Sequence, residues 1–308
     1  DLAAERGQSW IWALDAGEPK LLRQYDGLLR MLDPVGGHAA MDGRDGEVRL
    51  WSFAAPAGAA ATLLRRGEVG DVWSISFHPG GSWLASGDEG GIALWPLARP
   101  YPAVIRAHED AVNGMAYDPQ GRWVASGAKD GTLKLWPVDL GGEVRVFGRN
   151  LGEVPGGHFR GLAVSPDGNR LLAASDSEGV QMLSLDTPGE YGRLDLPGFR
   201  RDAIDVAFSP DGRLAAGTSL GFTDPEERVV RIWDMASMQE VKILGEDLPN
   251  IGHSLAFASD GGVLFATEAG LCLWDLDTGT SERVYEGRIF QFTANASSGH
   301  VLLVDTPP

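Results

Sequence analysis

The sequence predicts an all-β protein made of seven similar units of four strands, and two recurring patterns predict it. The first is a short apolar strand that ends in tryptophan or a substitute, and it returns every 39 to 50 residues along the 308-residue chain. Its marker residues are Trp12, Trp51, Trp95, Trp136, Leu183, Trp233 and Trp274. The second pattern lies upstream of most markers and is an apolar strand followed by a turn rich in Pro, Asp and Gly, as at residues 72–81 and 204–212.

The spacing and the periodicity together predict a seven-bladed β-propeller with four-stranded antiparallel blades. A repeat of about 40–45 residues with four strands is the propeller period. Apolar residues alternate every two positions in these segments, whereas helical repeats would show a 3.6-residue period. In the turns, proline presets the backbone and glycine takes the positive φ that closes a tight hairpin.

The two ends of the chain are expected to share one blade. Residues 288–292 and 300–304 have the pattern of inner strands that no outer strands follow, and residues 10–14 and 20–25 that of outer strands. A propeller removes most free sheet edges by closing into a ring. We therefore expect a single domain over 1–308, with the seventh blade formed by about 287–305 plus 1–26. A start at Asp1, inside a repeat, is what a module excised from a longer protein would have.

These repeats resemble those of the WD-repeat family over nearly the whole chain. The literal Trp-Asp pair occurs at residues 233–234 and 274–275, and proline follows the tryptophan at positions 95 and 136. Leu183 takes the tryptophan place in the fourth blade, which indicates a looser blade.

The resemblance also implies a polar tetrad inside the third blade. Its four members are His108, Ser126, Asp130 and Trp136. A Ser-His-Asp set also occurs in hydrolases, so a catalytic role is the alternative. Because tryptophan completes the set and a fragment of it recurs as Ser86 with Trp95, we predict a structural hydrogen-bond network.

Enzyme motifs are largely missing from the chain. It contains no Gly-rich phosphate loop that ends in Gly-Lys, no His-Glu-x-x-His and no Cys-x-x-Cys. We therefore expect no enzymatic activity, no cofactor and no metal. Two alternatives stay open: an enzyme with its site at the channel mouth, using Asp71, Asp202, His158 or His253, and a purely structural scaffold in a large assembly.

Members of this family usually bind partners on their narrow face, which comprises the loops leading into the first strand of each blade and the turns between strands two and three. Carried over by position, the predicted partner-binding residues are Arg44, Asp71, Trp73, Asp88, Asn113, Lys129, His158, Arg160, Asp202, Ile204, Phe222, His253 and Arg288. Trp73 is the most specific of these predictions. We expect it to be either an exposed interface anchor or a partly buried packing tryptophan. Residues 217–228 lengthen a turn of the fifth blade and are expected to project from this face with Phe222 near the tip.

The formal net charge of −17 disfavours non-specific binding to nucleic acid or to anionic membranes. No apolar run is long enough to span a bilayer. The lone Cys272 lies in an apolar run and is expected to be a buried small residue, which fits a cytoplasmic protein. Four lysines beside many arginines are typical of a GC-rich genome, so we expect a bacterial-type module.

The resemblance implies a non-catalytic interaction, scaffold or sensor propeller. Its expected partner is a protein, a peptide or an attached domain of the same protein. The chain also resembles the C-terminal propeller modules that are joined to signalling NTPases, kinases or caspase-like proteases, so we expect it to be the recognition module of a larger signalling protein.

Overall fold

A computed structural model describes the chain over residues 8–13, 20–26, 31–33, 37–42, 47–55, 60–65, 70–97, 103–138, 144–147, 158–185, 193–219, 221, 228–244, 251–258, 260–267, 270–287, 289–295 and 300–305. Every regular element in these ranges is a β-strand. Over the same ranges, no helix has the length and apolar character needed to cross a membrane. The predicted all-β class and the four-stranded antiparallel sheets are confirmed.

The described strands form seven four-stranded sheets, each named here by its innermost strand. The β3 sheet consists of β3 (Met31–Leu32), β4 (His38–Asp42), β5 (Glu47–Ser52) and β6 (Thr62–Arg65). The β7 sheet consists of β7 (Ser74–Phe77), β8 (Trp83–Gly87), β9 (Gly91–Pro96) and β10 (Ala103–Arg106). The β11 sheet consists of β11 (Val112–Tyr117), β12 (Trp123–Ala128), β13 (Leu133–Pro137) and β14 (Arg145–Phe147). The β15 sheet consists of β15 (Phe159–Val164), β16 (Arg170–Ser175), β17 (Gly179–Ser184) and β18 (Arg193–Asp195). The β19 sheet consists of β19 (Ala203–Phe208), β20 (Leu214–Ser219), β21 (Val230–Asp234) and β22 (Gln239–Leu244). The β23 sheet consists of β23 (Ile251–Phe257), β24 (Val263–Thr267), β25 (Gly270–Trp274) and β26 (Ser281–Glu286).

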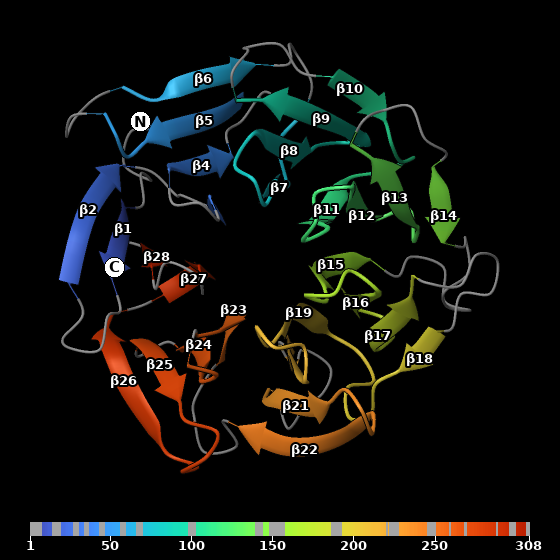
Figure 1. Cartoon of the computed structure of the whole chain (residues 1–308), viewed down its shortest axis with the longest axis vertical. Helices are drawn as coiled ribbons and strands as arrows, with labels where there is room; N and C mark the ends of the chain where they lie inside the picture. The colour runs from blue at the N-terminus through green and yellow to red at the C-terminus, as the bar shows by residue number, and fades with distance from the viewer. Residues whose placement is uncertain are drawn as a thin grey trace.

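The remaining sheet combines the two ends of the chain. It contains β27 (Ile289–Asn295), β28 (His300–Asp305), β1 (Gln8–Ala13) and β2 (Lys20–Asp26), in that order across the sheet. β1 pairs antiparallel with β28 along its whole length. Figure 1 shows the sheets standing around a common centre, with β7, β11, β15, β19, β23 and β27 nearest to it and the last strand of each sheet outermost.

The hydrophobic core lies between neighbouring sheets. Trp233 packs in a cluster that joins the β15 and β19 sheets, and Trp95 packs in one that joins the β3 and β7 sheets. Both tryptophans are fully buried. Because most sheets are covered on both faces, their middle strands are nearly continuous apolar runs, as in β16, rather than strictly alternating.

The turns between the first and second strands have the geometry that the Pro-Asp-Gly pattern predicts. In the β15 sheet, Ser165 Oγ donates to Asp167 Oδ1 at 2.5 Å and Gly168 has a φ of 76°. In the β19 sheet, Ser209 Oγ donates to Asp211 Oδ1 at 2.6 Å. The hydroxyl of Ser209 also holds the pKa of Asp211 below its ordinary value. These turns therefore close on side-chain hydrogen bonds as well as on glycine.

One position of the inner strands makes lateral contacts between sheets. Ser74 Oγ donates to the carbonyl of Val112 at 2.8 Å, which ties β7 to β11. The equivalent residue of β19, five positions before the turn proline, is Asp205. Its Oδ2 accepts the Leu255 N–H of β23 at 3.0 Å, and its Oδ1 accepts the Val206 N–H at 2.9 Å. The carboxyl group of Asp205 thus links the β19 and β23 sheets.

We expect this link to depend on pH. Burial raises the pKa of Asp205 from 3.8 to about 7, although the two N–H donors act against the shift. The folded protein therefore holds this proton more strongly than the unfolded chain does. The resulting stabilisation is fully present below about pH 4 and is lost as the pH rises through about 7.

Relative to Asp205→Asn, the wild-type free energy of unfolding should fall between pH 5 and 7 by up to about 1.4 kcal/mol per pH unit. Urea unfolding at three pH values in this window measures the difference. Asp211→Asn is the control, because the pKa of Asp211 is lowered and its titration lies below the window. Parallel stability curves for wild type and Asp205→Asn would contradict the assignment.

Candidate functional site

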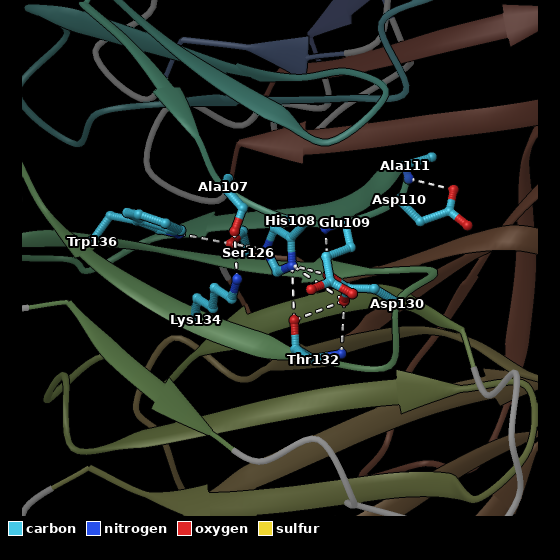
Figure 2. A network of polar contacts seen from close by, with 10 residues as sticks. All are labelled: Ala107, His108, Glu109, Asp110, Ala111, Ser126, Asp130, Thr132, Lys134 and Trp136. Carbon is cyan, nitrogen blue, oxygen red and sulfur yellow. Dashed lines mark hydrogen bonds and ion pairs between the residues drawn. The ribbon is translucent and has the colours of Figure 1, made fainter.

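The Ser-His-Asp set of the β11 sheet forms one connected hydrogen-bond network (Figure 2). His108 Nε2 lies 2.7 Å from Ser126 Oγ, and His108 Nδ1 lies 3.1 Å from Asp130 Oδ2 and 2.8 Å from Thr132 Oγ1. Trp136 Nε1 donates to Ser126 Oγ at 2.8 Å. Because the Thr132 hydroxyl donates to Asp130, the network assigns the imidazole proton to Nδ1. The hydrogen-bond order is therefore that of a catalytic triad.

Burial argues against catalysis by this network. Ser126 and the side chain of His108 are both 0% exposed, so no substrate can reach the serine oxygen. Burial raises the pKa of Asp130, but hydrogen bonds from His108, Thr132 and the Glu109 N–H outweigh it and lower that pKa well below its ordinary value. An ionised Asp130 receives these donors, so the network satisfies buried polar groups inside the blade.

Two other sheets have only parts of this network. In the β7 sheet, Trp95 Nε1 donates to Ser86 Oγ at 2.9 Å. In the β19 sheet, Phe199 takes the place of the histidine and meets Trp233 edge-on at 6.0 Å, and Trp233 Nε1 donates to the carbonyl of Pro197. Phenylalanine has no titratable group, so the packing of the β19 sheet at this position involves no acid-base chemistry.

A Gly-x-Ser-x-Gly pattern that sequence reasoning overlooked lies at residues 217–221. This spacing occurs at hydrolase nucleophiles, which sit exposed between a strand and a helix. Ser219 is instead the buried last residue of β20, with 0% exposure, and its Oγ accepts the Gly221 N–H. The pattern is therefore not a nucleophile elbow.

Metal and thiol chemistry find no support in the described part of the chain. Among those residues, no group of three or more His, Cys, Asp or Glu side chains is placed to hold a metal ion. Cys272 is buried, as predicted, and burial raises the pKa of its thiol. A buried thiol with a raised pKa is a poor nucleophile.

Two of the predicted partner-binding residues meet on the narrow face. Trp73, which leads into β7, is 43% exposed, and this favours the exposed anchor over the packing tryptophan. The Nζ of Lys129, from the turn between β12 and β13, lies over its ring at 5.6 Å from the centroid. Asp71 is exposed beside Trp73, and Asn113 is partly buried at the equivalent place in β11.

A second group on this face gathers around Asp176, which sequence reasoning missed. Asp176 Oδ1 accepts the backbone N–H of His158 at 2.8 Å, and its Oδ2 lies 3.3 Å from His158 Nδ1 and 3.4 Å from an Arg160 guanidinium nitrogen. The signal was available, because Asp176 and Lys129 both follow their turn proline by ten positions. The structure therefore brings together the predicted His158 and Arg160 through a turn carboxylate.

For three of the predicted contact residues, the structure corrects the expectation that the side chain is accessible to a partner. Asp88, Asp202 and Ile204 are only 5%, 8% and 8% exposed, so they present little side chain to a partner. The Oδ1 of Asp88 accepts the Gly91 N–H and shapes the turn before β9. Asp202 has a φ of 58° and donates its N–H to the carbonyl of Asp176, so it fixes the loop that leads into β19.

Four further predicted residues lie wholly or in part outside the described part of the chain. Arg44, Phe222 and Arg288 lie outside the described residues. The expected tip of the inserted loop, at Phe222, therefore also lies outside them. His253 belongs to β23, but its side chain is outside the described part.

Comparison with known proteins supports the resemblance on which the site was predicted. The family model "WD domain, G-beta repeat" matches residues 62–96 and 101–137. These two segments are therefore similar to WD40 repeats. They cover β6 to β9 and β10 to β13, and so include Trp73, Lys129 and the whole tetrad.

The relatives extend this similarity along the chain. The chain is 26% identical over 226 residues to transcription initiation factor TFIID subunit 5 of Caenorhabditis elegans, which covers 72% of the chain and 33% of that protein. It is 29% identical over 162 residues to nuclear distribution protein PAC1 of Gibberella zeae, which covers 52% of the chain and 34% of that protein. Protein HIR1 of Cryptococcus neoformans is 24% identical over 250 residues, 77% of the chain and 27% of that protein. The chain thus spans about a third of the length of these relatives, all of them eukaryotic, so they do not support a bacterial origin.

Proposed function

We propose that this chain is a non-catalytic interaction module that binds a protein or peptide partner on its narrow face. WD40 repeats support a protein-interaction role, and one relative is by name a subunit of a larger factor. The observation that carries the choice of face is Trp73, a tryptophan 43% exposed at the start of an inner strand. Seven sheets around one centre, with β1 paired to β28, support a closed seven-bladed scaffold that holds this face rigid.

The surroundings of Trp73 suit an anchor residue. The backbone N–H of Trp73 donates to the carbonyl of Gly87, so the residue is fixed to β8 at its base. Lys129 over the ring contributes a cation–π contact of about 0.5–1 kcal/mol at an exposed site. A side chain held in place before binding loses less entropy on binding, which favours affinity. Tryptophan is also among the residues that most often dominate interface energies.

A partner identified by affinity capture and then purified allows the direct test. We expect Trp73→Ala to raise the Kd by about thirtyfold, which corresponds to about 2 kcal/mol, with little change in Tm. Isothermal titration measures the Kd and thermal unfolding measures the Tm.

Two variants serve as controls for this prediction. Val104→Ala removes an equally exposed apolar side chain from the outermost strand β10, and Gln120→Ala alters a turn on the opposite face. Both should bind like the wild type. Loss of binding in Gln120→Ala, with normal binding by Trp73→Ala, would move the interaction to the opposite face.

A further inference from the structure

The exposed ring of Trp73 lies among carboxylates. Asp71 and Trp73 are both exposed while Val72 between them is buried, so the two side chains point outward from the same stretch of chain. The exposed side chain of Glu89 lies against Gly70, where an added Cβ would fall 2.9 Å from Glu89 Oε1. Neither Asp71 nor Glu89 takes part in an ion pair with another described residue. Both carboxylates are therefore available to a ligand at Trp73.

The loop leading into β11 brings another carboxylate to the same place. The Val112 N–H donates to the carbonyl of Asp88, and the Lys129 N–H donates to the carbonyl of Ala111, both at 2.9 Å. Asp110 Oδ1 accepts the Ala111 N–H at 2.7 Å, as Figure 2 shows. The carboxylate of Asp110 is thus held on the residue to which Lys129 is bonded.

The segments that these contacts join form the Trp73 sector, and their charge is strongly negative. They are residues 70–73, 87–90, 107–113 and 129–132. Together they carry six carboxylates and a single ammonium group, that of Lys129. Arg106 and Lys134, on the adjoining strands β10 and β13, reduce this excess without cancelling it. Around Asp176, by contrast, three arginines are balanced by three carboxylates of the same turn and loops. A cationic ligand is therefore attracted to the Trp73 sector.

A cation already lies over the ring of Trp73. It is the Nζ of Lys129, 5.6 Å from the ring centroid, and Trp73 remains 43% exposed with the lysine in place. The face of tryptophan attracts cations more strongly than that of any other aromatic side chain. A lysine ammonium is compact and strongly hydrated, whereas the planar, weakly hydrated guanidinium of arginine stacks on aromatic faces. An arginine of a partner can therefore take the place of Lys129 and leave the orientation of the ring unchanged.

We propose that the partner presents an arginine, which exchanges with Lys129 over the ring of Trp73 and pairs with Asp71 and Glu89. This inference rests on the proposed function, because it names the chemistry of the partner on the same face. Stacking uses the plane of the guanidinium, so the N–H groups at its edge stay free to donate to carboxylates. Lys129 is then an occupant of the site that the partner displaces.

The first test uses the full chain and a fluorescein-labelled peptide that alternates arginine and glycine. Fluorescence anisotropy at about 100 mM salt should show saturable binding, and none for the same peptide with glutamine in place of arginine. Trp73→Leu, which keeps an apolar side chain without an aromatic face, should weaken binding about tenfold. Asp71→Asn/Glu89→Gln should weaken it about as much. Asp277→Asn/Glu282→Gln is the matched control, because it removes an exposed Asp and Glu from the end of the β23 sheet where β25 turns into β26. This control should bind within about twofold of the wild type.

The second test examines the displacement of Lys129. Lys129→Gln should lower the Kd of the arginine peptide about threefold, because the competing cation over the ring is gone. Lys242→Gln is its control, since it removes the same charge where Nζ donates to the carbonyl of Leu276, away from the Trp73 sector. Lys242→Gln should bind like the wild type.

Several outcomes would overturn the proposal. Equal losses in the two acidic double variants would mean unspecific attraction to an acidic protein. A lysine peptide that binds as tightly as the arginine peptide would contradict the stacked guanidinium, and weaker binding by Lys129→Gln would contradict the displacement. If the purified natural partner loses affinity in Trp73→Ala but not in Asp71→Asn/Glu89→Gln, the interaction face stands and the arginine chemistry falls.

Discussion

Trp136→Ala should lower the free energy of unfolding by about 3–5 kcal/mol, as the loss of a large buried aromatic does. Trp136 is 6% exposed and packs in the cluster between the β7 and β11 sheets, with Leu94 and Val124 among its neighbours. The substitution leaves a cavity there and also removes the indole donor of Ser126. Urea unfolding followed by circular dichroism measures the change.

Ser126→Ala separates the structural role of the network from a catalytic one. It should cost about 1–3 kcal/mol, because Trp136 Nε1 and His108 Nε2 both lose a buried partner. Trp95→Ala is the parallel case in the neighbouring sheet and should resemble Trp136→Ala, since Trp95 is also buried and bonded to a serine. A Ser126→Ala protein that keeps its Tm but loses a hydrolytic activity would identify a nucleophile.

Much of the fold followed from the repeat, because the pattern that predicts a strand is the pattern that buries it. The expected inner strands at 288–292 and 300–304 correspond to β27 at Ile289–Asn295 and β28 at His300–Asp305. Differences of one to three residues at strand ends arise because a chain that is extended and paired can lengthen a strand without any change of sequence pattern. Leu183 is a further case in which the repeat pattern predicts burial, because leucine takes the place of tryptophan and is fully buried.

The site was predicted less completely, because equivalence in a repeat does not determine exposure. Trp73, Arg160 and Ile204 occupy one position of the inner strand, yet Trp73 and Arg160 are exposed and Ile204 is buried. The burial of Ile204 and Asp202 depends on the loop that leads into β19. The sequence pattern does not predict that Asp202 adopts a left-handed φ in this loop, or that its N–H donates to the carbonyl of Asp176. The position of Asp176 after its turn proline is a sequence signal, but only the structure shows that its side chain contacts His158 and Arg160, which lie 16 to 18 residues away in sequence.

Deletion of residues 1–26 should produce the largest effect of all and yield aggregated or unfolded protein. It removes β1 and β2, which are two of the four strands of the β27 sheet, and leaves β28 paired with β27 on one side only. A two-stranded hairpin is marginally stable, and an unpaired edge invites association with other chains. The apolar cluster between the β23 and β27 sheets, which includes Phe292 and Val301, would then be supported by a hairpin alone.

Size-exclusion chromatography with light scattering measures the outcome of this deletion. Deletion of residues 1–7 is the control, because it stops before β1 and leaves the pairing of Gln8 with Asp305 intact. Addition of a peptide of residues 1–26 during refolding should restore monodisperse protein, since the missing strands would then pair with β28 in trans. A monodisperse 27–308 fragment with the wild-type Tm would mean that the β1–β28 ladder is dispensable. The ring would then owe its stability to the packing between sheets and not to the strands shared by the two ends.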